Sequence, residues 1–158
     1  MKTVLATILA LALPTFAAAH EYTLGDLEII HPIIFETAAK AKSGGGYVTI
    51  ANVGESDDAL VAAKADFPKV MLHQSVEKDG VMTMKHVDKI AVPAGAIAEL
   101  APGGYHIMIM GLTEPFVAGQ EVPVTLVFET AGEIAVTFHV VEREDGMDHT
   151  KMDHATKE

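Results

Sequence analysis

Residues 70–112 read VMLHQSVEKDGVMTMKHVDKIAVPAGAIAELAPGGYHIMIMGL, and this stretch decides the fold class. Short runs rich in Val, Ile and Met alternate with turn signals, of which Asp79-Gly80 and Pro102-Gly103-Gly104 are the clearest. Asp-Gly between two such runs is a strong signal for a two-residue hairpin. Short strands at this spacing predict an antiparallel β-sandwich or barrel.

The same pattern continues on both sides of this stretch. We expect strands at Leu27–His31, Gly46–Ala51, Ala59–Ala65, Val70–Val76, Val81–His86, Ala96–Leu100, Tyr105–Met110, Val122–Glu129 and Glu133–Val141. Two segments, Glu36–Lys42 and Ala59–Ala65, could instead be helical on propensity.

The two ends of the chain differ from this β-rich part. Residues 1–19 combine a positive start, an apolar run over Val4–Leu13 and small residues up to Ala19, which is typical of a secretory signal peptide. Residues 20–142 have the size of one domain. Residues 143–158 are polar and charged, so we expect a disordered C-terminal tail. No cysteine follows the cleavage site, which argues against a membrane anchor after cleavage.

Charge and cysteine content exclude several classes of function. The chain has a formal net charge of −11, and no Lys/Arg cluster is present, which argues against nucleic acid as a partner. It contains no cysteine. That excludes a disulfide scaffold, a thiolate zinc site, a CxxC redox pair and a blue-copper electron carrier, whose copper needs a thiolate.

Histidine and methionine are concentrated in the opening stretch. His73, Met84, His106 and Met108 follow the pattern H-x10-M-x21-H-x-M, and five of the eight methionines lie between Met71 and Met110. A single methionine in a strand is more often a packing residue. Two imidazoles and two thioethers together, however, form a soft neutral ligand set that favours copper(I).

Strand alternation predicts how these residues meet. His106 and Met108 share a face of their strand, and the Asp79-Gly80 turn makes the strands of His73 and Met84 neighbours. We therefore expect one cluster built from three strands, at the end of the sandwich.

At this point the sequence resembles the periplasmic copper chaperones called PCu(A)C. The resemblance rests on the spaced His/Met motif and on the segments His31-Pro32, Gly45-Gly46-Tyr47, Val92–Gly95 and Leu100–Met108. It implies an all-β, cupredoxin-like Greek-key sandwich that holds one copper(I) through His73, Met84, His106 and Met108. It also implies delivery of copper for cytochrome c oxidase assembly, to an oxidase subunit or a Sco-type protein. Many relatives have Trp after the His-Pro pair, whereas Ile33 follows here.

Four further residues near the motif lie outside it: Met71, Met82, His86 and Met110. We interpret them as packing or supporting residues, with His86 and Met110 the best alternates as ligands.

The tail repeats Met-Asp-His at Met147–His149 and Met152–His154. Thioethers and imidazoles repeated in this way indicate a second metal site, with copper(II) favoured by the imidazoles and nearby carboxylates. His20 would offer an amine and an imidazole to copper(II) if cleavage follows Ala19. For both segments the plainer interpretation is a chain end without a role.

These observations favour a monomeric, non-enzymatic copper(I) chaperone of the periplasm. A copper buffer or resistance protein without a specific acceptor fits the same residues. A copper-dependent oxidase using His20, and a structural β-sandwich with packing methionines, are the alternatives from other classes.

Overall fold

The computed structural model describes residues 21–143, which form eleven β-strands. The strands are β1 (Glu21–Leu24), β2 (Leu27–Phe35), β3 (Ser43–Asn52), β4 (Asp58–Lys64), β5 (Lys69–Lys78), β6 (Val81–His86), β7 (Ile90–Val92), β8 (Ile97–Leu100), β9 (Tyr105–Met110), β10 (Glu121–Phe128) and β11 (Glu133–Val141). Within this range no helix has the length and hydropathy needed to span a membrane.

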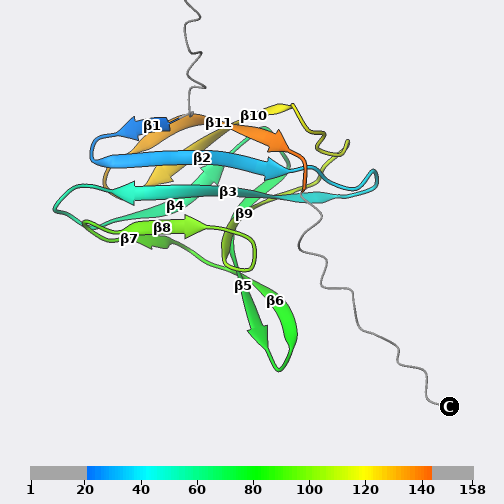
Figure 1. The fold of residues 1–158 in the computed structure, drawn as a ribbon, viewed down its shortest axis with the longest axis horizontal. Coiled ribbons are helices and arrows are strands. Elements are labelled where there is room, and N and C mark those ends of the chain that lie inside the picture. Colours follow the sequence, from blue (N-terminus) through cyan, green and yellow to red (C-terminus); the bar gives the residue numbers. More distant parts are fainter. Residues whose placement is uncertain (1–20, 144–158) are drawn as a thin grey trace, which may run out of the picture.

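The strands form two packed layers (Figure 1). Hydrogen bonding runs in the order β6-β5-β9-β8-β3-β2-β11-β10-β4-β7, and β1 pairs with β2. The sheet folds over on itself, because β4 contacts β5 and β7 contacts β3 and β8 across the core. Most pairs are antiparallel, while β2–β11 and β8–β9 are parallel. The all-β, cupredoxin-like sandwich is therefore confirmed.

The core lies between the layers and follows the alternation of the sequence. Along β10 and β11, buried Val, Leu and Phe alternate with residues that are half-buried or exposed. The largest fully buried side chains include Phe138, Ile29, Ile50 and Leu126. Each such side chain contributes about 1.5–3 kcal/mol through removal from water.

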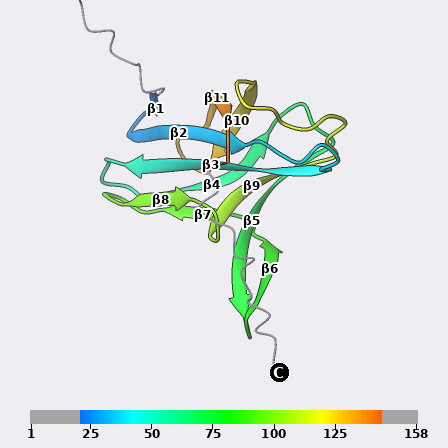
Figure 2. The same cartoon turned by 45° about the vertical axis from the view of Figure 1, so that its right-hand side comes forward.

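The β5–β6 hairpin projects away from the two layers (Figures 1 and 2). Its turn residues Asp79 and Gly80 both have positive φ, at 54° and 77°. Two consecutive positive φ values define the hairpin turn that matches strand twist, and the Asp-Gly pair suits it. The turn fixes the register, with Lys78 opposite Val81 and His73 opposite His86.

The structure corrects the helical alternatives. All of Ala59–Ala65 except Ala65 falls in β4, because pairing with both β7 and β10 outweighs its alanine-rich propensity. Glu36–Lys42 forms no helix, since Glu36 and Thr37 donate their backbone N–H groups to Val141 and Phe116. Strands β1 and β7 were not predicted. Residues 1–20 and 144–158, which include His20 and both Met-Asp-His repeats, lie outside the described residues.

Candidate metal centre

The register of three neighbouring strands brings the four motif residues onto one face of the sheet. His73 on β5 lies opposite His106 on β9. Ser75, two residues along β5, lies opposite Met84 on β6. Directly opposed residues point to the same side of a sheet, as do residues two apart on one strand. Met108 therefore joins His106 on this face.

The face in question is turned away from the core. Leu72, Ile107 and Ile109, which alternate with the motif residues, are buried between the layers. The cluster consequently lies on the outward face of the sheet, at the base of the β5–β6 hairpin.

His106 is buried, with 3% of its surface exposed. Its Nδ1 lies 3.3 Å from the carbonyl oxygen of Gly104, which also accepts the backbone N–H of Ser75 at 2.9 Å. A carbonyl can only accept, so the neutral ring carries its proton on Nδ1 and a lone pair on Nε2. That Nε2 is buried and has no hydrogen-bond partner among residues 21–143. The lone pair of this Nε2 is therefore available to a metal ion.

His73 lies beside it, with the two ring centroids 5.8 Å apart and the planes at 76°. Its Nδ1 is also buried without a hydrogen-bond partner within the described residues. Burial lowers the pKa of His73, and the neighbouring His106, His86 and Lys69 lower it further. A lowered pKa keeps the imidazole neutral, which is the form that binds a metal.

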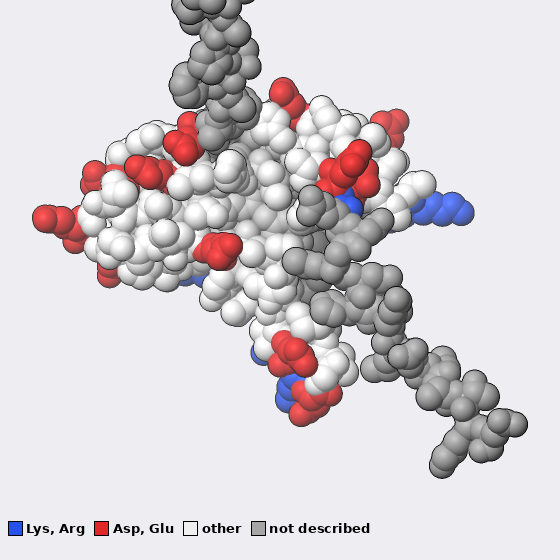
Figure 3. Space-filling model, in the orientation of Figure 1, with Lys and Arg blue, Asp and Glu red and all other residues white. Residues whose placement is uncertain are grey.

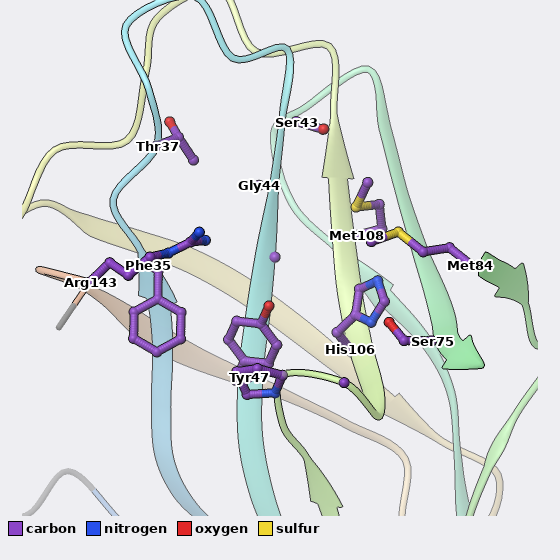
Figure 4. A pocket seen from close by; sticks show the side chains of 13 residues that line it. Phe35, Thr37, Ser43, Gly44, Tyr47, Ser75, Met84, His106, Met108 and Arg143 are labelled. Carbon is purple, nitrogen blue, oxygen red and sulfur yellow. The ribbon is translucent and has the colours of Figure 1, made fainter. Parts of the chain in front are cut away.

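The two thioethers complete the cluster (Figure 4). Met108 is half-buried on β9, whereas Met84 on the edge strand β6 is 61% exposed. The Met84 side chain extends from β6 towards Met108, so that the two sulfur atoms face each other next to His106 (Figure 4). The His/Met cluster thus has a buried side and a side open to solvent.

A pocket of about 240 Å³ opens next to these residues. Its lining includes Met84, His106, Met108, Tyr47, Phe35 and Arg143. The Arg143 guanidinium lies 5.8 Å from the centre of the Phe35 ring, whose centroid is 5.4 Å from that of Tyr47. Pockets for drug-sized molecules measure about 300–1,000 Å³, so this one suits an ion or a small group.

Tyr47 forms the wall of the pocket behind His106, with ring centroids 6.4 Å apart. Burial raises the pKa of Tyr47, and Arg143 partly offsets this. The phenol position depends on Gly45, because a Cβ on Gly45 would lie 2.8 Å from the Tyr47 hydroxyl oxygen. The tyrosine therefore remains a neutral side chain packed over the strand.

The alternates differ in position. His86 lies opposite His73, with ring centroids 6.0 Å apart. Met110 lies one cross-strand pair beyond the cluster, opposite Lys69 and Ser43. Met82 is exposed on β6. Within the described part of the chain, no three His, Asp or Glu side chains converge as a metal site.

Tyr47 and Arg143 were not predicted as site residues. Tyr47 follows three glycines in a strand, a signal of close packing around an aromatic ring, but its contact with His106 depends on the pairing of β3 with β9. The two imidazole nitrogens without partners could not be identified from sequence, since their state depends on tertiary hydrogen bonding.

Comparison with protein families matches residues 27–140 to the family described as "Putative lipoprotein LpqE-like". A protein of Leifsonia xyli subsp. xyli, described as "Putative lipoprotein Lxx21020", is 39% identical over 97 residues. That match covers 57% of this chain and 58% of the relative, so the chain matches just over half of the relative's length.

Among solved structures, the copper-bound PCuAC domain from PmoF2 superposes with a TM-score of 0.66 and 27% identity. This superposition covers 78% of this chain and 99% of that domain. The apo PCuAC domain from PmoF1 superposes with a TM-score of 0.68 and 28% identity, and the match covers 78% of this chain and the whole of that domain. The solution structure of CuI-DR1885 from Deinococcus radiodurans shares the fold, with a TM-score of 0.59 and 24% identity, over 79% of this chain and 83% of that one.

Proposed function

This chain belongs to the LpqE-like family and has the fold of PCuAC domains, and from this premise we propose that it is a copper(I) chaperone rather than an enzyme. The structures it resembles include a copper-bound domain. Copper is then the cargo that the protein carries, and the chemistry required of the chain is binding and release.

The ligands in this proposal are His73, Met84, His106 and Met108. The observation that carries it is the pair of buried, unpartnered nitrogens, His73 Nδ1 and His106 Nε2, in the described structure. A buried polar atom without a hydrogen bond costs about 1–3 kcal/mol, so such atoms call for a partner. A metal ion supplies that partner, and the adjacent thioethers select a soft one.

Neutral imidazole and thioether ligands suit both the binding and the release of copper(I). They bind copper(I) well and bind hard cations poorly. They also bind it less strongly than thiolates, so copper can pass to a thiolate-rich acceptor. The exposure of Met84 supports this, because an acceptor ligand can replace a solvent-facing thioether first.

The destination in this proposal is cytochrome c oxidase copper-centre assembly, with an oxidase subunit or a Sco-type protein as acceptor. The support is the resemblance of the His/Met motif to periplasmic chaperones. The periplasm is the proposed location, supported by the signal-like residues 1–19 and by a relative described as a lipoprotein.

A second copper site is proposed at the chain ends, formed by Met147, His149, Met152 and His154, with His20 as a further copper(II) ligand. These residues lie outside the described structure. The support is positional, because Arg143 lines the pocket and the tail follows directly after it. A tethered ligand set raises the local concentration of metal near the first site.

Anaerobic copper(I) titration against a competing chelator tests the function. The protein should bind one copper(I) tightly without residues 143–158, and zinc should bind that truncated protein much more weakly. Equal or stronger zinc binding there contradicts the proposal. Transfer to a purified thiolate-bearing acceptor then separates a chaperone from a buffer, which would retain its copper.

A further inference from the structure

His73 lies between two imidazoles at nearly the same spacing. Its ring centroid is 5.8 Å from that of His106 on β9 and 6.0 Å from that of His86 on β6. Both pairs are edge-on, with planes at 76° and 70°. Two imidazoles bound to one ion have centroids about 6 Å apart when nearly opposed, since metal–nitrogen bonds measure about 2 Å. Either pair therefore has a spacing at which one metal ion fits.

The two flanking imidazoles are also held in the same way. His106 Nδ1 lies 3.3 Å from the Gly104 carbonyl oxygen, and His86 Nδ1 lies 3.1 Å from that of Leu72. A neutral ring that donates from Nδ1 has its lone pair on Nε2. Backbone carbonyls that fix a histidine in this manner are common around metal ligands. His86 is thus prepared as a ligand without belonging to the His/Met motif.

The two rings differ in access to solvent. His106 is 3% exposed, whereas the His86 side chain is 49% exposed on the edge strand. Its Nε2 is 3.5 Å from Asp88, whose side chain is fully exposed and can turn away. The three imidazoles do not converge on one point within residues 21–143. His73 can therefore share an ion with one neighbour at a time.

We propose that His86 is the transfer ligand of the copper site, an inference that rests on the proposed function. In the resting position copper(I) is bound by the four motif residues. On transfer, the bond from copper to His106 Nε2 breaks as a bond to His86 Nε2 forms. Copper remains in the +1 state, and no electron or proton moves. Met84, two residues from His86 on the same strand face, remains bound in both positions. The ion is then at the solvent side, where an acceptor thiolate can reach it.

Two substitutions separate a ligand role from a structural one. His86→Asn keeps a side-chain donor near the Leu72 carbonyl but removes the Nε2 ligand. His86→Met removes the donor but supplies a thioether for copper(I). If His86 only supports the hairpin, Asn should preserve function and Met should not. If His86 binds copper during transfer, the Met variant should preserve function and the Asn variant should not.

The measurement uses the full-length mature protein loaded anaerobically with one copper(I) and mixed rapidly with excess bicinchoninate, a chromogenic copper(I) chelator. For His86→Asn the transfer rate should fall by about tenfold or more while the equilibrium affinity stays within about threefold. His86→Met should transfer within about threefold of the parent. Met82→Leu, on the same face of the same strand, is the matched control and should leave both quantities unchanged.

An unchanged rate in His86→Asn overturns the inference. So does a loss of equilibrium affinity in His86→Asn accompanied by faster transfer, which would make His86 a resident ligand. Failure of the parent protein to bind copper(I) is a separate result, since it contradicts the proposed function itself.

Discussion

His73 and His106 each place an unpartnered ring nitrogen in a buried position of the described structure. An apolar core would not retain two such groups, because leucine at either position would avoid a desolvation cost of about 1–3 kcal/mol. Their presence on the outward face of the sheet, beside two methionines, supports the proposed metal site over a packing cluster.

Met108→Leu removes one sulfur and keeps the apolar volume. We expect a change of less than about 1.5 kcal/mol in the free energy of unfolding. Copper(I) affinity should fall by about tenfold or more, which corresponds to about 1.4 kcal/mol. Chelator competition measures the affinity, and Met82→Leu is the control with an expected small effect. Tight binding by Met108→Leu at parental strength would make Met108 a packing residue.

Acidity should weaken the site through its imidazoles. The pKa of His73 lies below its ordinary value of 6.5, mainly because of burial. The neutral ring of His73 therefore persists to lower pH than that of an ordinary histidine, and protons compete with copper there only below that ordinary pKa. Thioethers do not titrate there, so a methionine-dependent remainder of affinity should persist. Titrations between about pH 7 and 5 measure this, and a flat profile would exclude the histidines as ligands.

The same shift affects the protein without metal. The folded state holds His73 neutral at pH values where the unfolded chain takes up a proton. Stability therefore decreases as pH falls from the ordinary pKa of 6.5 towards the lower folded value. The loss of stability at low pH that comes from His73 should be absent when the melting temperature of His73→Leu is measured against pH.

At the scale of elements, the β5–β6 hairpin places one thioether. Every residue of β6 is exposed, so the strand is positioned by its pairing with β5 and by the turn rather than by the core. The turn requires positive φ at Asp79 and Gly80. The proposed metal site consequently depends on a hairpin to which the sandwich core contributes little.

Gly80→Val should therefore impair copper binding more than folding. A β-branched residue at φ 77° is strained by about 1–2 kcal/mol, which favours loss of the hairpin register and displaces Met84. We expect a copper(I) affinity at least about fivefold lower and a nearly unchanged melting temperature.

Gly95→Val is the matched control, because Gly95 also has positive φ, at 66°, and open space around it, but lies in the turn between β7 and β8. That variant should change stability and leave copper affinity unchanged. Equal copper affinity in the two variants would show that the hairpin turn does not position the site.

The element scale also shows what sequence could predict. Val81–His86, Tyr105–Met110 and Glu133–Val141 begin and end as predicted, because Asp-Gly, Pro-Gly-Gly and Ala-Gly turns punctuate strong alternating runs. β1 and β7 have four and three residues, too few for a periodic signal, and exist through pairing with β2 and β4.

For the site, sequence predicted the shared face but not its details. Spacing along one strand is local, so the sequence alone predicts that His106 and Met108 share a face of their strand. The place of His86 beside His73 and the packing of Tyr47 on His106 depend on cross-strand register. Those relations are set by tertiary pairing.

For the molecule as a whole, charge is unevenly mixed. Acidic side chains dominate the body of the sandwich in Figure 3, while the projecting hairpin carries both signs. The hairpin charges are Glu77, Lys78, Asp79 and Lys85. Acidic side chains of like sign on this face of the body repel one another, and the mixed charges of the hairpin do not.

Removal of residues 143–158 should leave one copper(I) per chain and an almost unchanged melting temperature of the apo-protein. The removed segment is charged and poor in apolar residues, so it offers little surface to bury. A second truncation that retains Arg143 keeps its cation–π contact with Phe35, worth about 0.5–1 kcal/mol. Metal analysis and calorimetry on both proteins provide the measurement. Loss of core copper(I) binding would mean that the tail supplies resident ligands.

The exposure of Met84 on the projecting hairpin has a consequence under oxidative stress. Peroxide converts accessible thioethers to sulfoxides, which are polar and no longer offer a thioether ligand. Met84 is 61% exposed, while Met108 is half-buried, so oxidation should reach the outer ligand first. Mild peroxide treatment followed by peptide mass spectrometry should find the sulfoxide at Met84 before Met108. Loss of the Met84 thioether should then weaken copper(I) binding by the proposed site, and reduction of the sulfoxide should restore it.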